Sequence, residues 1–232
     1  MTTALERMRG GLVVSVQAPP GSPLAAPEQL AAIARAVEAG GAAGIRAEGP
    51  AALEAIRAAV DLPVIGLVKR RAADTEVYIT PALEDALAVA DAGAELVAVD
   101  ATERRRADGS TGPEFVSALA AELPGRVVAD VDGANAGRAA AEAGAAAVAT
   151  TLSGYLGADG AAPPAEPDLA LVAELAAELD GPILAEGRYA TAAHVRAAFE
   201  AGAFAVVVGT AITDPTALTR ALAAASPGGA HG

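Results

Sequence analysis

The stretch EAGAFAVVVGT at residues 200–210 decides the fold, because the chain carries the same pattern three more times. An acid, an alanine, a glycine and a short apolar run recur as EAGGAAGIRAE at 38–48, DAGAELVAVDA at 91–101 and EAGAAAVATTL at 142–152. The four copies begin 53, 51 and 58 residues apart, at positions 38, 91, 142 and 200. The glycine suits the left-handed conformation that ends a helix, and an apolar run without polar alternation is typical of a buried parallel strand. Each copy therefore predicts a helix end that leads into a strand.

A second set of helix stops lies between the copies. Leu62-Pro63, Leu123-Pro124-Gly125 and Gly181-Pro182 each precede another apolar run, so every period holds two strand–helix units. The pattern predicts eight strands, at residues 11–17, 43–48, 64–69, 96–102, 126–132, 147–152, 183–187 and 205–209. Eight evenly spaced units favour an α/β fold with a single (β/α)8 TIM barrel, a parallel eight-stranded sheet, over the alternative of an open doubly wound sheet.

The whole chain is expected to form one domain. Residues 1–232 divide into a short N-terminal helix at 1–10, the barrel at 11–225 and a frayed tail at 226–232, with a long loop at 157–167. A hydrophobic content of 53% and a charged content of 19% supply enough material for a packed core.

Charge and composition exclude several classes of function. A net charge of −13 repels phosphate backbones and anionic lipids, so we expect no nucleic-acid partner and no membrane partner. The longest uncharged stretch, residues 10–27, contains four prolines and is no membrane span, and the first ten residues lack an apolar signal core. With no cysteine and two distant histidines, His194 and His231, we expect cytoplasmic chemistry without a metal. His194 itself is expected to have a structural surface role.

In a TIM barrel the active site lies at the carboxyl ends of the strands. Lys69 ends the run at 64–68 and Glu186 ends the run at 183–185, on the third and seventh predicted strands, which face each other across an eight-stranded ring. Inverting a carbon centre requires proton transfer on both faces, so a lysine opposite a carboxylate fits an epimerase. Spacing alone leaves two alternatives open: a solvated strand end for Lys69 and a helix N-terminal charge for Glu186.

Glycines follow the last two strands. Gly187 lies after the seventh strand, and Gly209 lies after the eighth, followed by Thr210. Barrels commonly bind a phosphate there through backbone N–H groups at the start of a short extra helix, and residues 211–213 are long enough for that turn before Asp214-Pro215 opens the last helix. These positions favour a phosphorylated substrate, although both glycines could simply turn the chain. The basic run at 103–106 is expected to be solvated, with one arginine pointing inward.

Several motifs lie in order along residues 10–220. They are GLVVSVQA at 11–18, GIRA at 44–47, Lys69-Arg70, VYITP at 77–81, Asp100-Ala101-Thr102, Ala129-Asp130, TTLSGY at 150–155, AEGR at 185–188 and VVG at 207–209. These motifs resemble those of N-acetylmannosamine-6-phosphate 2-epimerases. The resemblance implies a TIM barrel that interconverts N-acetylmannosamine 6-phosphate and N-acetylglucosamine 6-phosphate without a cofactor, in sialic-acid or amino-sugar catabolism. It also implies that the enzyme can form a homodimer.

The same resemblance assigns roles to residues. Lys69 and Glu186 carry the proton transfer, the residues Gln17, Arg46 and Asp130 hold the sugar, and the backbone around Gly187 and Gly209 holds the phosphate. We also expect Ser153 and Arg188 to contact the substrate and Thr210 to contact the phosphate. The chain departs from the family pattern at Val16, where a cysteine is usual, at Glu48, where an asparagine is usual, and at Asp214, where an arginine is usual. An acid at position 214 would repel a phosphate, and Arg188 or an arginine at 104–106 would have to compensate.

Two readings of other classes remain open beside the epimerase. Lys69 could form a Schiff base in an aldolase that acts on a phosphorylated sugar. Alternatively, the chain could bind a sugar phosphate without turning it over, which Asp214 makes conceivable.

Overall fold

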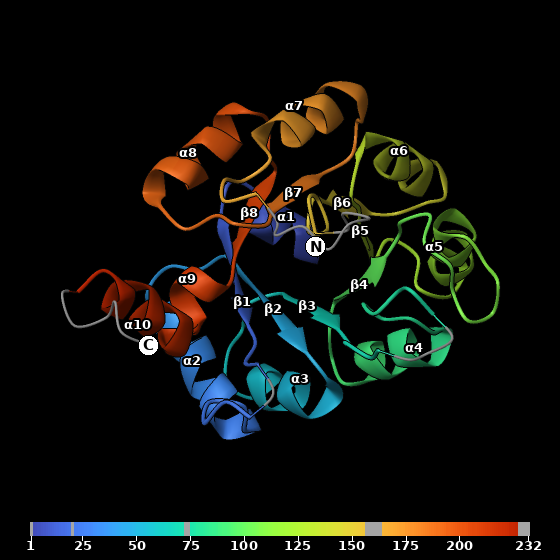
Figure 1. Cartoon of the computed structure of the whole chain (residues 1–232). Coiled ribbons are helices and arrows are strands. Elements are labelled where there is room, and N and C mark those ends of the chain that lie inside the picture. The colour runs from blue at the N-terminus through green and yellow to red at the C-terminus, as the bar shows by residue number, and fades with distance from the viewer. Residues whose placement is uncertain (1, 20, 72–74, 156–163, 227–232) are drawn as a thin grey trace.

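Eight parallel strands close into a barrel in the computed structural model, which describes residues 2–19, 21–71, 75–155 and 164–226. Each strand pairs with the next along the chain and β8 pairs with β1, so the ring has no free edge (Figure 1). The (β/α)8 prediction is confirmed and the open sheet is excluded. The strands are β1 Leu12–Val16, β2 Gly44–Glu48, β3 Val64–Leu67, β4 Leu96–Asp100, β5 Val127–Asp130, β6 Ala147–Ala149, β7 Ile183–Glu186 and β8 Ala205–Val208.

Helices alternate with the strands and surround the barrel (Figure 1). They are α1 Ala4–Met8, α2 Pro27–Ala39, α3 Pro50–Arg57, α4 Leu83–Asp91, α5 Gly112–Glu122, α6 Ala134–Glu142, α7 Leu169–Glu178, α8 Ala192–Glu200, α9 Thr210–Thr213 and α10 Pro215–Ala224. α1 closes the amino end of the barrel, where the fully buried Met8 contacts the backbone of Gly44. A β-carbon at Gly44 would lie 2.8 Å from Cε of Met8, so the glycine makes room for this plug.

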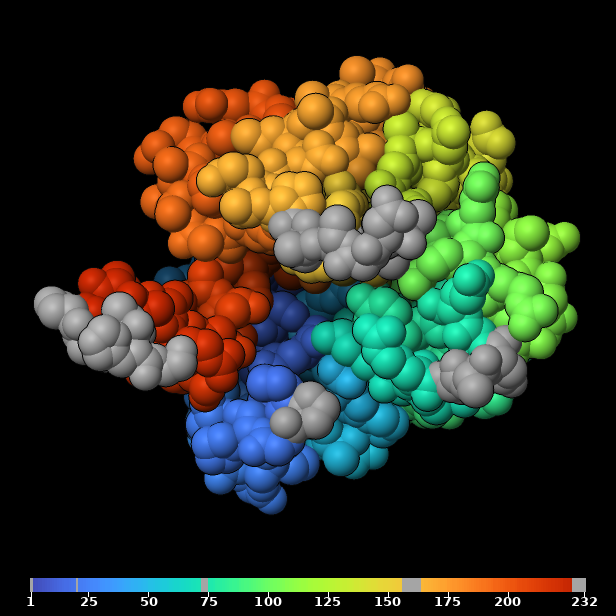
Figure 2. Space-filling view, viewed as in Figure 1, coloured from blue at the N-terminus to red at the C-terminus, as the bar shows by residue number. Residues whose placement is uncertain are grey.

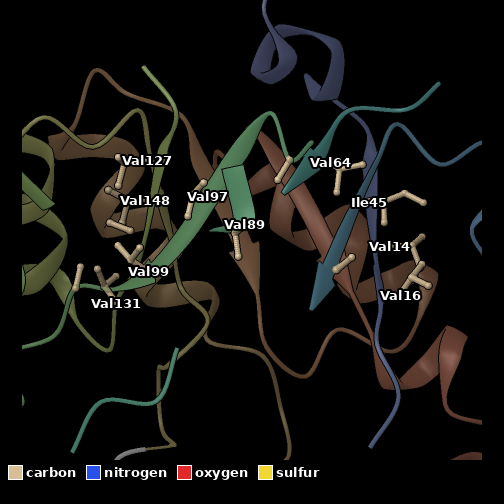
Figure 3. Packing of buried hydrophobic residues seen from close by; sticks show 14 of the residues in the cluster. Val14, Val16, Ile45, Val64, Val89, Val97, Val99, Val127, Val131 and Val148 are labelled. Atoms are coloured by element: carbon tan, nitrogen blue, oxygen red, sulfur yellow. The ribbon is translucent and has the colours of Figure 1, made fainter. Parts of the chain in front are cut away.

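Strand alternation divides the core into two clusters. Val14 and Val16 of β1 face the helices, together with Ile45 of β2 and Val97 of β4 (Figure 3). Val13 faces the barrel interior with Ile65 and the other members of the inner cluster. Because side chains alternate between the two faces, the residues two positions beyond each inner member also point inward, toward the open mouth.

The predicted strands are longer than the observed ones at most carboxyl ends. Prediction extended the fourth strand to residue 102 and the sixth to 152, whereas β4 ends at Asp100 and β6 ends at Ala149. The apolar residues beyond these ends are buried in turns: Leu152 is 1% exposed, and its backbone N–H donates to the Val131 carbonyl oxygen. Burial without strand pairing therefore accounts for the overestimate.

The helix-stop glycines behave as predicted in three of the four repeats. Gly93, Gly144 and Gly202 have φ values of 97°, 98° and 99°. In the first repeat Gly40 keeps a right-handed φ of −76°, and the next residue, Gly41, takes the left-handed conformation with φ 92°. The prediction is wrong there because a second glycine is available one position later.

The short N-terminal helix and the extra turn after the eighth strand are both present, as α1 and α9. Residues 227–232 of the tail predicted at 226–232, and residues 157–163 of the loop predicted at 157–167, lie outside the described residues. Among the helices that the structure describes, none is long and apolar enough to cross a membrane.

Candidate active site

A buried arginine joins two carboxylates at the base of the mouth. Arg46 of β2 donates to both oxygens of Asp130 on β5, at 3.0 and 2.6 Å, and its Nη1 lies 2.9 Å from Oε2 of Glu186 on β7. Arg46 and Asp130 are 1% and 0% exposed, whereas Glu186 is 14% exposed and faces the opening. Burial on its own would lower the pKa of Arg46, but the two anions raise it above its ordinary value. The guanidinium therefore stays charged and fixes both carboxylates.

The surroundings of Glu186 raise the pKa of its carboxyl above the ordinary value of a glutamate. Burial raises the pKa of its carboxyl, against the lowering effect of Arg46, and the nearby charge of Asp130 raises the pKa further. The Thr151 hydroxyl lies 3.1 Å from Oε2 of Glu186 and 2.7 Å from Oδ1 of Asp130, so it is within hydrogen-bond distance of both acids and can donate to either one. The net effect is a raised pKa, which suits a group that takes up and returns protons.

Lys69 lies directly after β3, on the other side of the mouth. Its ammonium donates to Oε1 of Gln17, which follows β1, and lies 3.6 Å from Oε2 of Glu48 at the end of β2. The Lys69 side chain is 41% exposed, so a small molecule can reach it from solvent. A cavity of about 340 Å³ adjoins Gln17 and Glu48.

Lys69 and Glu186 lie at the carboxyl ends of β3 and β7, which are opposite each other in the ring. The charge of Lys69 acts on the carboxyl of Glu186 and lowers its pKa, so the two groups are near enough to interact. The space-filling view shows a depression at the centre of this face, bordered by the blue, green and orange parts of the chain (Figure 2). The two residues therefore come from opposite strands, and their roles in proton transfer stay a prediction. A larger cavity of about 590 Å³ lies at the amino end, beside Leu5 and Arg126, away from these residues.

The predicted phosphate positions lie between the ends of β7, β8 and β1. Gly187 has φ 112°, a conformation that favours glycine, and Gly209 stands directly before α9. A β-carbon at Gly209 would lie 3.3 Å from Cβ of Ser15, which brings this backbone against β1. Thr210 is exposed at the start of α9, next to the mouth.

The side chains of Ser153 and Arg188 are engaged in hydrogen bonds within the protein. The Ser153 hydroxyl donates to Asp168 at 2.6 Å, and Asp168 caps α7. Arg188 donates to the carbonyl oxygens of Ser153 and Glu166 at 2.6 and 2.7 Å, and its guanidinium lies 5.2 Å from the centre of the Tyr155 ring. These contacts fix the loop after β6 against the end of β7.

The basic run at 103–106 differs from the prediction, because two of its arginines fold inward. Arg106 is 1% exposed and stacks on Phe115 at 3.7 Å, while Arg104 forms an ion pair with the buried Asp100. Burial raises the pKa of Asp100, against the hydrogen bonds from Thr102 and the charge of Arg104. The ion pair with the buried carboxylate of Asp100, at the end of β4, therefore accounts for the inward orientation of Arg104.

Asp214 and His194 have structural partners. The Asp214 carboxylate accepts from the backbone N–H of Ala217 at 2.9 Å and so caps α10. His194 lies in the first turn of α8 with Nε2 3.2 Å from Glu166, a surface contact that agrees with its predicted structural role.

Three residues of the mouth were missed at the level of sequence. Glu48 and Thr151 lie two positions after the inward-facing Arg46 and Ala149, so strand alternation could have identified both. Tyr78 lies in the segment between β3 and α4, and its phenol interacts electrostatically with Arg46 and Asp130. Only the motif VYITP drew attention to that segment.

The fold and the groups at its mouth define a class of protein, the TIM-barrel isomerases. The family model described as "Putative N-acetylmannosamine-6-phosphate epimerase" matches residues 30–226. The chain belongs to this family of epimerases.

Individual relatives agree over most of this chain. A Cutibacterium acnes protein named "Putative N-acetylmannosamine-6-phosphate 2-epimerase" is 47% identical over 218 residues, covering 91% of this chain and 92% of the relative. The Brucella melitensis "Bifunctional enzyme NanE/NanK" is 46% identical over 93% of this chain, which corresponds to 40% of that longer protein. The solved structure of the N-acetylmannosamine-6-phosphate 2-epimerase from Clostridium perfringens superposes with a TM-score of 0.88 at 34% identity and covers 96% of both chains.

Proposed function

We propose that this protein interconverts N-acetylmannosamine 6-phosphate and N-acetylglucosamine 6-phosphate by moving the proton at C2, in sialic-acid or amino-sugar catabolism. The observation that supports the proposal is that Lys69 and Glu186 lie at the carboxyl ends of β3 and β7, on opposite sides of the ring, and interact electrostatically. Epimerisation needs access to both faces of one carbon, and this arrangement offers it.

The chemistry follows from the acidity of the C2 proton. That proton is acidic only beside a carbonyl group, so the reaction runs through the open-chain aldehyde. One of the two groups, Lys69 or Glu186, accepts the proton from one face and leaves an enolate, and the other delivers a proton to the opposite face. A substrate hydroxyl activated by Lys69 can replace the amine, with Glu186 steering the proton. These steps use side chains alone, without a metal or another cofactor.

Binding roles are assigned to the groups around this pair. Gln17, Arg46 and Asp130 orient the sugar and hold the proton-transfer groups, which their mutual contacts support. Ser153 and Arg188 contact the substrate at the rim of the hollow. The hydrogen bond from Arg188 to the Ser153 carbonyl oxygen holds this rim in place.

Backbone amides at Gly187, Gly209 and Thr210 take the phosphate. The positive φ of Gly187 and the position of α9 directly after β8 support this assignment. Asp214 is engaged as a helix cap, and Arg104, Arg106 and Arg188 already have protein partners. We therefore propose that the phosphate is held chiefly by N–H groups, with little help from side-chain cations.

The test is incubation with N-acetylmannosamine 6-phosphate in deuterated water, followed by proton NMR. Conversion to the gluco epimer with one deuterium at C2 is the expected result. Cleavage of the sugar, with trapping of a substrate adduct by borohydride, would replace the epimerase with a Schiff-base aldolase. Binding without any C2 exchange would identify a non-catalytic binder.

We also propose that the protein acts in the cytoplasm as a homodimer, without nucleic-acid partners. α10 supports the homodimer: it has no buried residue, and Leu218 and Leu222, one turn apart, are 39% and 75% exposed. An apolar stripe of this kind on a helix at the edge of the molecule (Figure 1) is typical of a surface that a second copy covers.

A further inference from the structure

The segment after β3 folds back over the mouth and places Tyr78 beside Lys69. Ile79 forms an antiparallel bridge with Lys69, and the Tyr78 carbonyl oxygen accepts from the Arg70 N–H at 2.9 Å. The Thr80 N–H donates to the Val68 carbonyl oxygen at 2.7 Å, which fixes the segment on the other side. Backbone hydrogen bonds at Tyr78 and on both sides of it therefore hold its backbone in place.

Two arginines fix the ring of Tyr78. The guanidinium carbon of Arg71 lies 4.4 Å from the ring centre, and that of Arg104 lies 5.7 Å from it. Arg104 is itself held by Asp100 and by the Glu76 carbonyl oxygen. The ring also packs against the inner cluster of the barrel, so its orientation is set by its neighbours.

The phenol of Tyr78 is close enough to the charged base of the mouth to interact electrostatically with Asp130 and Arg46. Burial raises the pKa of Tyr78, and the charge of Asp130 raises it further, against Arg104 and Arg71. The same phenol contributes to the electrostatic environment of Arg46. At neutral pH the hydroxyl therefore keeps its proton and can donate it to a hydrogen bond.

Within the part of the chain that the structure describes, the Tyr78 hydroxyl has no hydrogen-bond partner, and it is not among the buried polar atoms that lack one, so it is accessible. Several other donors of the mouth already have partners. The Nη atoms of Arg46 bind two carboxylates, and the Thr151 hydroxyl lies within hydrogen-bond distance of the same two acids. The amide nitrogen of Gln17 donates to Ser15 Oγ at 2.9 Å, and Lys69 donates to Gln17 Oε1. The phenol is thus a neutral donor of this mouth that is available to a bound molecule.

Resting on the proposed function, we propose that Tyr78 is a further catalytic residue, whose hydroxyl donates a hydrogen bond to O1 of the open-chain sugar. When the C2–H bond breaks, its proton goes to the base and its electron pair forms the C1–C2 double bond. The π pair of the C1 carbonyl moves to O1, which becomes the enolate oxygen. Reprotonation at C2 reverses these movements, and Tyr78 keeps its own proton throughout. A donor at O1 stabilises the charge that develops in the transition state more than it stabilises the neutral aldehyde.

The test is Tyr78→Phe, which removes the hydroxyl and leaves the ring between its two arginines. Tyr189→Phe is the control, because the Tyr189 hydroxyl also lacks a partner among the described residues but is buried and belongs to the outer cluster. Steady-state turnover of N-acetylmannosamine 6-phosphate gives kcat and KM, and thermal unfolding checks that both variants fold.

The expected result is a fall in kcat of about 10²- to 10³-fold for Tyr78→Phe, the usual effect of losing one oxyanion donor, with KM nearly unchanged. Tyr189→Phe keeps the wild-type kcat. A fall in kcat of less than about tenfold, or a loss confined to KM, overturns the role of Tyr78. Wild-type protein that shows no C2 exchange overturns the proposed function itself, so the two failures are distinguished.

Discussion

Arg46 organises the mouth at the scale of single residues. Its guanidinium donates hydrogen bonds to both carboxylate oxygens of Asp130 and also forms an ion pair with Glu186. One buried cation therefore orients two anions. Removing it would leave a buried carboxylate without compensation, which is more costly than losing the pair altogether. The carboxyl of Glu186, to which we assign proton transfer, is therefore positioned by a residue that need not itself touch the reacting carbon.

Thr151→Val tests the state of Glu186 through the pH dependence of kcat/KM. In the direction of reaction in which Glu186 accepts the proton, it must start as the carboxylate, so kcat/KM in that direction is lost as pH falls through its raised pKa. The Thr151 hydrogen bond favours the carboxylate and lowers that pKa, so its removal raises the pKa further and shifts the acid limb to higher pH. Thr102→Val is the control, since its hydroxyl donates to Asp100 at 2.7 Å instead. An acid limb that moves equally in both variants, or in neither, would contradict this role.

Sequence reasoning reached some of these residues and missed others for physical reasons. Lys69 and Glu186 follow apolar runs, and a parallel barrel brings all such positions to one mouth. Tyr78 depends on residues 77–80 folding back onto residues 68–70, a tertiary contact that no local pattern encodes. The inward turn of Arg104 depends in the same way on the burial of Asp100.

At the scale of elements, β3 packs unusually close to its covering helix. A β-carbon at Gly66 would lie 2.5 Å from Cγ1 of Val89 on α4 and 2.7 Å from Cβ of Ala94. Val89 and Ala94 are 0% and 1% exposed, so neither can move aside easily. This glycine lets α4 approach the strand that carries Lys69.

Gly66→Ala is expected to lower the free energy of unfolding by about 1–3 kcal/mol, because an added methyl group overpacks this contact. Gly181→Ala provides the control, since no atom lies within 4 Å of a β-carbon there. Urea unfolding of both variants measures the difference. Equal stability of the two variants would show that the strand–helix contact is looser than described.

The elements themselves were predictable because their signals are local. Acid-Ala-Gly stops and apolar runs placed all eight strands, and the chain after β8 was long enough to imply α9. Strand ends were less accurate, since buried turn residues such as Leu152 are as apolar as strand residues. A strand ends where its pairing with the neighbouring strand ends. This pairing depends on two segments, so the sequence of one segment does not predict it.

At the scale of the whole molecule, α10 stands apart from the other helices. It contributes no buried residue, whereas α2, α3 and α5 each bury three or more. Figure 1 shows α9 and α10 at the edge of the molecule, on the side opposite α4 and α5. A helix that covers little of its own barrel is available to a second copy.

Leu222→Asp is expected to weaken the proposed homodimer, because a carboxylate would be desolvated in an apolar contact. Leu83→Asp is the matched control, as Leu83 is another exposed leucine, at 37%, on the far side of the barrel. Sedimentation velocity over a concentration series compares the two with the wild type. A wild-type monomer, or equal dissociation of both variants, would remove α10 from the interface.

The most direct measurement is C2 hydrogen exchange in deuterated water, with N-acetylmannosamine 6-phosphate, by wild-type protein and by Lys69→Ala. The wild type should form the gluco epimer with deuterium at C2. Lys69→Ala should keep its fold and lose exchange by about 10²- to 10⁴-fold or more, the range that a positioned acid or base supplies. Exchange at the wild-type rate in Lys69→Ala would show that the proton at C2 moves without the side chain that faces Glu186 across the barrel.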